Sequence, residues 1–181
     1  MSLRTKNQTK TREVARAVVL TALAVALSPF SIPVGPVKIF PAMHFVNVTS
    51  AVMLGPLYAV LIAFTTSLLR LALGTGTINA FAGSMIGALL AGLVYRITRN
   101  IYLAAAAEVF GTGVLGSLVT VYLVAPTFLN KQLAFDAIFL SFFFSTLAGS
   151  VLALGGLKVL NRAGYFLPGS RQAATEQAGK A

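Results

Sequence analysis

Apolar runs separated by short breaks of glycine, proline and polar residues follow one another along most of the chain. A helix rises about 1.5 Å per residue and the hydrocarbon core of a bilayer is about 30 Å thick, so roughly 20 apolar residues form one spanning helix. The pattern therefore predicts six membrane-spanning helices, of which the second is short. The expected helices cover residues 13–29, 43–54, 56–73, 80–97, 101–125 and 135–160.

The second and third apolar runs are separated only by Gly55 and Pro56. Proline has no backbone N–H and clashes with the preceding helical turn, so one continuous helix is not expected here. We expect a broken helix or a tightly turned hairpin whose helix ends lie within the protein.

The composition indicates an integral membrane protein. Hydrophobic residues make up 57% of the 181 residues, charged residues only 10%, and the mean hydropathy is +0.85. Six spans use nearly the whole chain, so the expected fold class is an all-α integral membrane protein without a soluble catalytic domain. The chain has no cysteine, which excludes disulfides, thiol nucleophiles and cysteine-based metal sites.

Basic residues give the chain a formal net charge of +10 and lie at the ends of the apolar runs, which indicates membrane topology rather than nucleic-acid binding. The three basic clusters are Arg4, Lys6, Lys10, Arg12 and Arg16 before the first span, Arg96 and Arg99 after the fourth, and Lys158, Arg162, Arg171 and Lys180 after the sixth. With six spans all three lie on one side, which the positive-inside tendency assigns to the cytoplasm. Both termini are therefore expected in the cytoplasm, whereas five spans would place the last cluster on the opposite side.

The expected organisation follows from these boundaries. Residues 1–12 form a basic cytoplasmic segment, residues 13–162 a six-helix membrane domain, and residues 163–181 a cytoplasmic tail. The tail is small and polar without an apolar stripe, so we expect it to be disordered.

Prolines and a glycine crowd the connection between the first two spans, which predicts an extended and partly rigid segment. They are Pro29, Pro33, Gly35, Pro36 and Pro41. This segment is either a lid over the outer mouth of the bundle or an ordinary turn between helices.

The only histidine of the chain lies directly after this segment. His44 and Asn47 are three residues apart, which places them on one face of the second helix, and Lys38 and Phe40 precede them. Polar side chains inside a bilayer usually face a cavity or a ligand, so we expect these four residues to bind a substrate. The alternative is that a neighbouring backbone carbonyl satisfies His44. One histidine without cysteine or an acidic cluster cannot complete a metal site, so no metal is expected.

Glu108 is the second polar residue inside an apolar run, where a charged carboxylate costs about 3 kcal/mol on insertion scales. It should therefore point inward and accept a hydrogen bond from a substrate hydroxyl or amine. Alternatively it forms a structural hydrogen bond, or pairs with a basic residue such as Arg70. Asn79 and Tyr122 are expected either to line the same cavity or to cap a loop and anchor the membrane interface.

Small residues recur with four-residue spacing in the first, fourth and sixth spans, as in Ala22 and Ala26. Such faces allow close helix packing, usually within one bundle. The alanine stripe of the first span has no polar residue, which makes it the better candidate for contact with another subunit.

These features resemble the substrate-binding S components of energy-coupling factor (ECF) transporters, which are small six-helix membrane proteins. The alanine pair Ala22 and Ala26 matches a hallmark of that family. The segments PVGPVKIFPAMHFVNV and AVMLGPLYA resemble its ThiW branch, which is assigned to uptake of the thiazole precursor of thiamine. The resemblance extends from about residue 12 to residue 162.

The resemblance implies a multi-pass protein of a prokaryotic cell membrane that captures a vitamin-type molecule from outside and is not an enzyme. It implies docking through the alanine face on a coupling transmembrane subunit with two ATPase subunits, and delivery by toppling of the S component in the bilayer. The chain has no G-x-x-x-x-G-K-[ST] phosphate loop, so ATP hydrolysis must come from those partners, and no cofactor is expected.

For hydroxyethylthiazole the ring nitrogen needs a hydrogen-bond donor, the hydroxyl needs a partner, and the ring needs apolar walls. Lys38 or His44, Asn47 or Glu108, and Phe40 are the respective candidates. The chain lacks tryptophan, so ring stacking is expected from residues such as Phe40, Phe81 or Tyr122. Two alternatives remain: another vitamin or modified base as the ligand, or an intramembrane enzyme using His44 and Glu108 as base and acid.

Overall fold

Helices form nearly all of the structure, a computed structural model that describes residues 2–35 and 37–164. They are α1 (Ser2–Ala26), α2 (Pro41–Leu54), α3 (Pro56–Ala72), α4 (Asn79–Thr98), α5 (Ile101–Phe110), η1 (Gly111–Gly116), α6 (Ser117–Val119), η2 (Thr120–Leu129) and α7 (Phe135–Arg162). The stretch from α5 to η2 is one continuous helix with π-helical parts, so the described chain contains the six predicted helices. The tail predicted over residues 163–181 lies outside the described residues from residue 165 onward.

Three of these helices are long and apolar enough to span a bilayer: α4, the continuous helix over 101–129, and α7. The apolar helices α2 and α3 are shorter, with 14 and 17 residues. Large apolar side chains remain exposed on α3 and α7, among them Leu57, Leu61, Leu68, Val151 and Val159. So much exposed apolar surface on several helices is typical of a protein surrounded by lipid.

The predicted break between the second and third helices is confirmed at Gly55. Its φ angle is 87°, a left-handed value that glycine adopts without steric cost. Pro56 then begins α3, at a position where its missing N–H costs nothing. The chain reverses here within one residue, and α2 and α3 pack against each other.

The fold class needs one correction, because the connection after α1 forms a small β-hairpin. Strands β1 (Ile32–Val34) and β2 (Val37–Ile39) pair in antiparallel register, with Ile32 opposite Ile39. The Ser141 hydroxyl of α7 donates a hydrogen bond to the Lys38 carbonyl at 2.7 Å. The extended conformation predicted from the prolines is therefore present. Pairing between the two strands and the hydrogen bond from Ser141 of α7 satisfy backbone groups of this segment.

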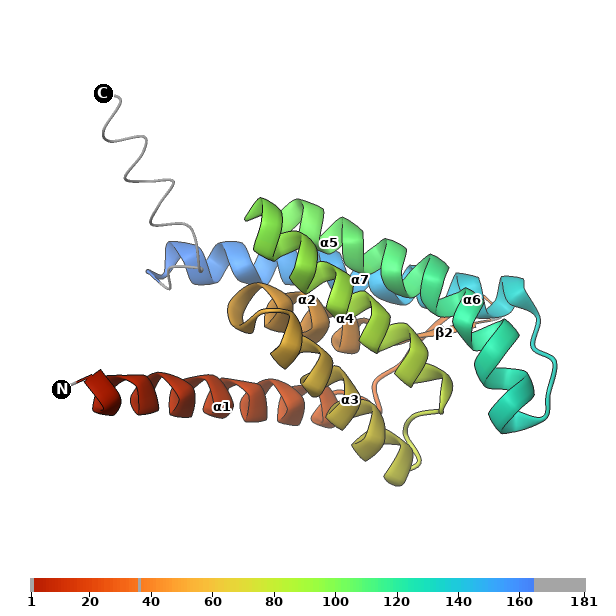
Figure 1. Cartoon of the computed structure of the whole chain (residues 1–181). Helices are drawn as coiled ribbons and strands as arrows, with labels where there is room; N and C mark the ends of the chain where they lie inside the picture. Colours follow the sequence, from red (N-terminus) through yellow and green to blue (C-terminus); the bar gives the residue numbers. More distant parts are fainter. Residues whose placement is uncertain (1, 36, 165–181) are drawn as a thin grey trace.

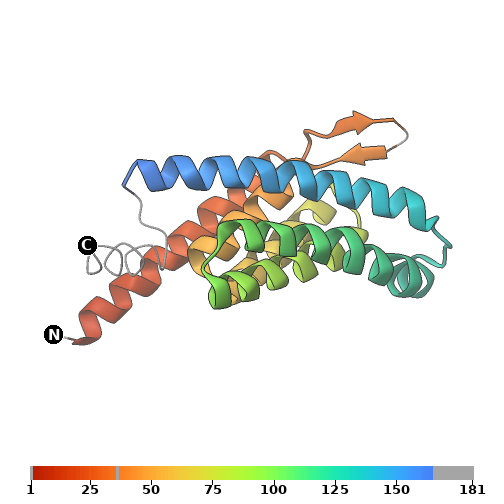
Figure 2. The same ribbon diagram turned by 90° about the horizontal axis from the view of Figure 1, so that it is seen from above.

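The central helix is α2, which packs against α3, α4 and α7 and has ten of its fourteen residues buried. Helix α1 packs along α2 and α3 at one side of the bundle (Figure 1). The start of α1, the α4–α5 connection and the end of α7 lie at one end of the molecule, while the hairpin lies at the other (Figure 2). Polar residues near the start of α2 are therefore enclosed at the hairpin end.

Candidate functional site: a polar pocket in the helix bundle

A pocket of about 290 Å³ lies where α2, α3, α4 and α7 meet at the hairpin end. Phe40 and His44 enter it from the start of α2, Arg70 from the end of α3, and Phe142 from α7. The loop over residues 74–77 and the start of α4 complete the wall. The volume is near the lower end of the range for small-molecule sites, which fits a single-ring ligand.

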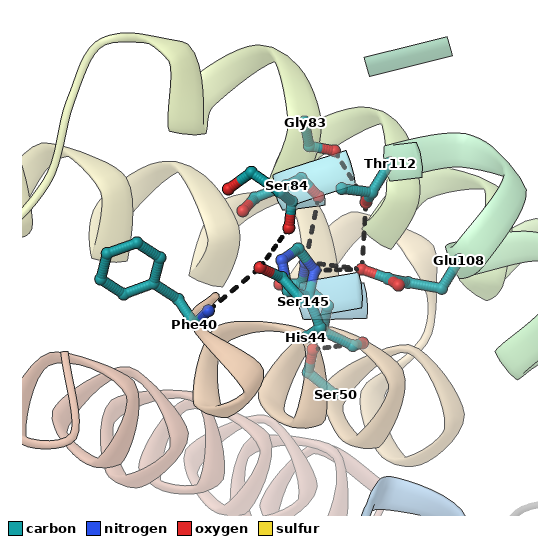
Figure 3. A network of polar contacts seen from close by, with 10 residues as sticks. Phe40, His44, Ser50, Gly83, Ser84, Glu108, Thr112 and Ser145 are labelled. Atoms are coloured by element: carbon teal, nitrogen blue, oxygen red, sulfur yellow. Dashed lines mark hydrogen bonds and ion pairs between the residues drawn. The ribbon is translucent and has the colours of Figure 1, made fainter. Parts of the chain in front are cut away.

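Behind the pocket, three side chains converge on one oxygen of Glu108 (Figure 3). Nδ1 of His44 lies 2.7 Å from Oε1, Nδ2 of Asn47 donates to it at 3.2 Å, and the Thr112 hydroxyl lies 3.1 Å from it. Asn47 also donates to the Ser84 carbonyl at 3.3 Å. A carboxylate is an acceptor only, so it can receive all of these donors.

Glu108 is fully buried, and its hydrogen bonds link α2 to α5 and orient the imidazole of His44. Its partner is therefore His44, not the Arg70 that was the alternative from sequence. His44 is likewise satisfied by a carboxylate rather than by a neighbouring backbone carbonyl. Within the described residues Oε2 of Glu108 has no hydrogen-bond partner.

Arg70 forms a second polar centre at the other side of the pocket. Its Nη2 donates to the Thr75 carbonyl at 3.1 Å, and its guanidinium lies 5.0 Å from the centre of the Phe40 ring. The side chain is only 4% exposed, and Nε has no partner among the described residues. The cation–π contact and the hydrogen bond hold the guanidinium in the pocket wall.

Glycines allow the polar groups to approach the helix backbones. A Cβ atom on Gly87 of α4 would collide with the Thr112 hydroxyl and lie 3.1 Å from Glu108 Oε1. A Cβ atom on Gly149 of α7 would lie 2.6 Å from the Cβ of His44. Gly87 and Gly149 therefore allow the helices to pack closely within the bundle, next to the site.

The structure brings five of the seven predicted site residues together. Phe40, His44 and Asn79 line the pocket, and Asn47 and Glu108 lie directly behind it. Oδ1 of Asn79 is buried without a partner among the described residues, so an acceptor is available at the start of α4.

The structure does not bring Lys38 and Tyr122 to this pocket. The Lys38 side chain is exposed on β2, because successive residues of a strand point to opposite faces and its neighbour Ile39 takes the buried face. Tyr122 is 69% exposed on η2 and lines a separate hollow beside Lys131. Phe81 packs edge-on against Phe64 at 5.7 Å rather than facing the pocket.

Sequence reasoning missed several pocket residues. Arg70 was predicted only as an alternative partner of Glu108, although a lone arginine at the end of an apolar helix is itself a signal of a functional site. Phe142, Ser141 and Ser145 of α7 carried no signal, because phenylalanine and serine are common in membrane helices. Phe40 N donates to the Ser145 hydroxyl at 3.0 Å, which fixes the start of α2 against α7.

Ala22 and Ala26 are exposed on α1. They lie in an apolar groove of about 640 Å³ between α1 and α3, whose other wall includes Leu61 and Leu69. The groove is on the outside of the bundle and separate from the polar pocket.

Apolar helices long enough to cross a bilayer, together with a polar pocket between them, define a membrane-embedded protein with a site of small-molecule size. In the described part of the chain, no group of three histidine or acidic side chains could hold a metal ion.

The comparison with known families gives the particular class. The profile of the family described as "Thiamine-precursor transporter protein (ThiW)" matches residues 14–163. The chain therefore belongs to the ThiW family, whose members are S components of ECF transporters for the thiamine precursor hydroxyethylthiazole, and it is a transporter rather than an enzyme. No curated protein matches the chain.

Proposed function

We propose that this chain is the substrate-capture subunit of an ECF-type uptake system in a prokaryotic cell membrane. It binds hydroxyethylthiazole from outside in the pocket between α2, α3, α4 and α7. It then docks on an ATP-driven coupling module and delivers the ligand by toppling in the bilayer.

The observation that carries this proposal is the match between the pocket and a small heteroaromatic alcohol. Phe40 and Phe142 supply apolar walls for the ring. The imidazole of His44 places a polar group next to these walls and is held in position by Glu108. The unpartnered Oδ1 of Asn79 accepts a hydrogen bond from the ligand hydroxyl, which would remove the cost of leaving that buried oxygen unpaired.

Asn47 and Glu108 act one step away from the ligand in this proposal. Neither is part of the pocket wall, but Glu108 holds His44, and Asn47 holds Glu108 and ties α2 to the Ser84 carbonyl of α4. Buried networks of this kind position a side chain at the site and restrict its rotamers.

The arrangement of charge supports an outward-facing pocket. The start of α1, the α4–α5 connection and the end of α7 share one end of the molecule. The described basic residues of the three clusters belong to these segments, and those of the third cluster are Lys158 and Arg162. The positive-inside tendency places that end in the cytoplasm. The pocket and the hairpin lie at the opposite end and therefore face outside.

The partner proposed for the α1 side is the coupling transmembrane subunit, which carries two ATPase subunits. The groove containing Ala22 and Ala26 exposes small and apolar side chains, which would let a partner helix approach α1 closely.

The experiment that tests the ligand is thermal unfolding of the detergent-purified protein with hydroxyethylthiazole, thiamine, the pyrimidine precursor of thiamine, riboflavin, biotin and pantothenate. A ligand that binds only the folded state raises the unfolding temperature by mass action. A selective increase with the thiazole supports the proposal. An increase with a different vitamin keeps the transport class and replaces the ligand, and no increase with any compound contradicts the proposed pocket.

A further inference from the structure

Arg70 carries a positive charge in the pocket wall, whereas the thiazole alcohol is neutral and offers it no opposite charge. The guanidinium lies in the pocket wall and is only 4% exposed. A buried cation without an opposite charge is costly, so such groups are normally paired. The partner of Arg70 is therefore informative about the ligand.

No carboxylate of the described residues is paired with Arg70. The carboxylate of Glu108 lies against His44 instead, and its Oε1 is also contacted by Asn47 and Thr112. Glu13 is on α1 and lines a hollow with Arg96 and Arg99, and Asp136 is exposed in the first turn of α7. Among residues 2–35 and 37–164, the positive charge of Arg70 in the pocket thus has no counter-charge.

The hydrogen bonds of Arg70 also leave donors free. Nη2 is used by the Thr75 carbonyl, whereas Nε has no partner in the described part of the chain and no hydrogen bond from Nη1 is formed there. The guanidinium carbon lies 5.0 Å from the centre of the Phe40 ring, so the cation is held beside an aromatic side chain in the pocket wall. Guanidinium N–H groups without a protein partner form charge-assisted hydrogen bonds with carboxylate and phosphate oxygens.

The start of α4 adds to the positive potential of the same pocket. Asn79 and Ala80, the first residues of this 20-residue helix, line the same pocket as Arg70. The N-terminal end of a helix carries partial positive charge from its unsatisfied N–H groups and favours an anion.

We propose that the pocket recognises an anionic group on its ligand, and that a thiazole whose side arm ends in a carboxylate or phosphate binds more tightly than the thiazole alcohol. This inference rests on the proposed function, since it places the ring of the same ligand class between the same aromatic walls. The anionic end lies against Arg70, and the ring extends toward His44.

Affinity measurements on the folded wild-type protein test this directly. Binding of hydroxyethylthiazole, of the corresponding thiazole acetic acid and of the phosphate ester of hydroxyethylthiazole is measured by calorimetry in detergent. We expect at least one anion to bind about tenfold or more tightly than the alcohol, because charge-assisted hydrogen bonds are roughly twice as strong as neutral ones. A preference for the acid or for the ester identifies which anion the pocket takes.

Variants separate recognition from a structural role of Arg70. Arg70→Gln should remove the preference for the anion, whereas Arg70→Lys should keep part of it. Lys131→Gln removes a positive charge at an exposed position of the η2–α7 loop and should leave the preference unchanged. Equal weakening of all three ligands by Arg70→Gln would mean that the residue only supports the 74–77 loop, and would overturn the inference.

The wild-type comparison decides the matter even if the Arg70 variants do not fold. If the alcohol binds as tightly as both anions, the inference is wrong and the proposed function stands. If no thiazole binds to a folded sample that binds another vitamin, the proposed function itself fails, and the inference fails with it.

Discussion

Nδ1 of His44 lies 2.7 Å from Oε1 of Glu108, across 64 residues of sequence, and joins the central helix α2 to α5 inside the bundle. This contact orients the ring of the only histidine at the pocket wall. It also allows both polar residues to be buried in the apolar interior, because each satisfies the hydrogen-bonding group of the other.

Replacing Glu108 by glutamine should lower both thermal stability and ligand affinity. The amide keeps the shape of the side chain and can keep its oxygen toward Asn47 and Thr112, but it loses the charge and places an NH2 group where the unpartnered Oε2 lay. We expect affinity to decrease about tenfold, in line with a charge-assisted bond of roughly 1.5–3 kcal/mol. Thermal unfolding and calorimetry measure the two effects. The matched control is Glu13→Gln on α1. Equal unfolding temperatures and equal ligand affinities of the two variants would contradict the role of Glu108 in holding the site.

His44→Ala should weaken binding while the protein remains folded and extractable. The substitution removes a pocket side chain and leaves the Glu108 carboxylate with Asn47 and Thr112. We predict an affinity loss of about tenfold, typical of one polar contact to a ligand. Gln132→Ala, at an exposed loop position, is the control. An affinity equal to that of the control would exclude His44 from the site.

Gly87→Ala tests the close approach of α4 to α5. The added methyl group would collide with the Thr112 hydroxyl and press on Glu108, so the helices must separate. We expect a stability loss of about 1–3 kcal/mol, the usual cost of overpacking a core. Gly155→Ala adds the same methyl group on α7, where nothing lies within 4 Å, and should be tolerated. Similar unfolding temperatures for both variants would contradict the packing described for Gly87.

Ala22→Leu and Ala26→Leu should impair assembly with the coupling subunit and leave ligand affinity unchanged. Both positions are exposed in the groove between α1 and α3, far from the pocket contacts of His44. A leucine there would prevent the close approach of a partner helix. Co-purification of the complex and calorimetry on the isolated protein measure the two properties. Ala106→Leu, exposed on α5, is the control, and normal co-purification of both groove variants would show that this face is not the interface.

Phe40→Ala and Tyr122→Ala should differ sharply in ligand affinity. Phe40 lines the pocket and makes a cation–π contact with Arg70, whereas Tyr122 is exposed on η2 and lines another hollow. We expect the first variant to lose affinity by about tenfold, as for loss of one aromatic contact with its buried area. The second should bind like the wild type. Loss of binding in Tyr122→Ala would place the ligand outside the pocket described above.

Most of the helical framework could be predicted from the sequence. The expected second, third, fourth and sixth helices agree with the observed ones to within two residues at each end. Apolar runs and their glycine and proline breaks determine these boundaries, because hydrogen bonding within a helix and burial in lipid are both local requirements. The first helix differs: it begins at Ser2, so the basic segment and the first apolar run form one helix.

The site was partly predictable for the same reason. Polar residues inside apolar runs stand out, so His44, Asn47 and Glu108 were identified, but their direct contact was not. The Arg70 position depends on the turn of the chain at residues 74–77, which brings Thr75 back to the end of α3. Phe142 and Ser145 reach the pocket only because α7 packs along α2.

The sequence by itself determined the class of this protein, its number of helices, its distribution of charge and its family, since these follow from local composition and from motifs read along the chain. Only the tertiary structure decided which polar groups meet. The partner of Glu108 is His44 rather than Arg70, and Lys38 and Tyr122 point away from the pocket. The physical reason is that hydrogen bonds between helices depend on the relative rotation and depth of packed helices, which small residues such as Gly87 and Gly149 set through contacts distant in sequence.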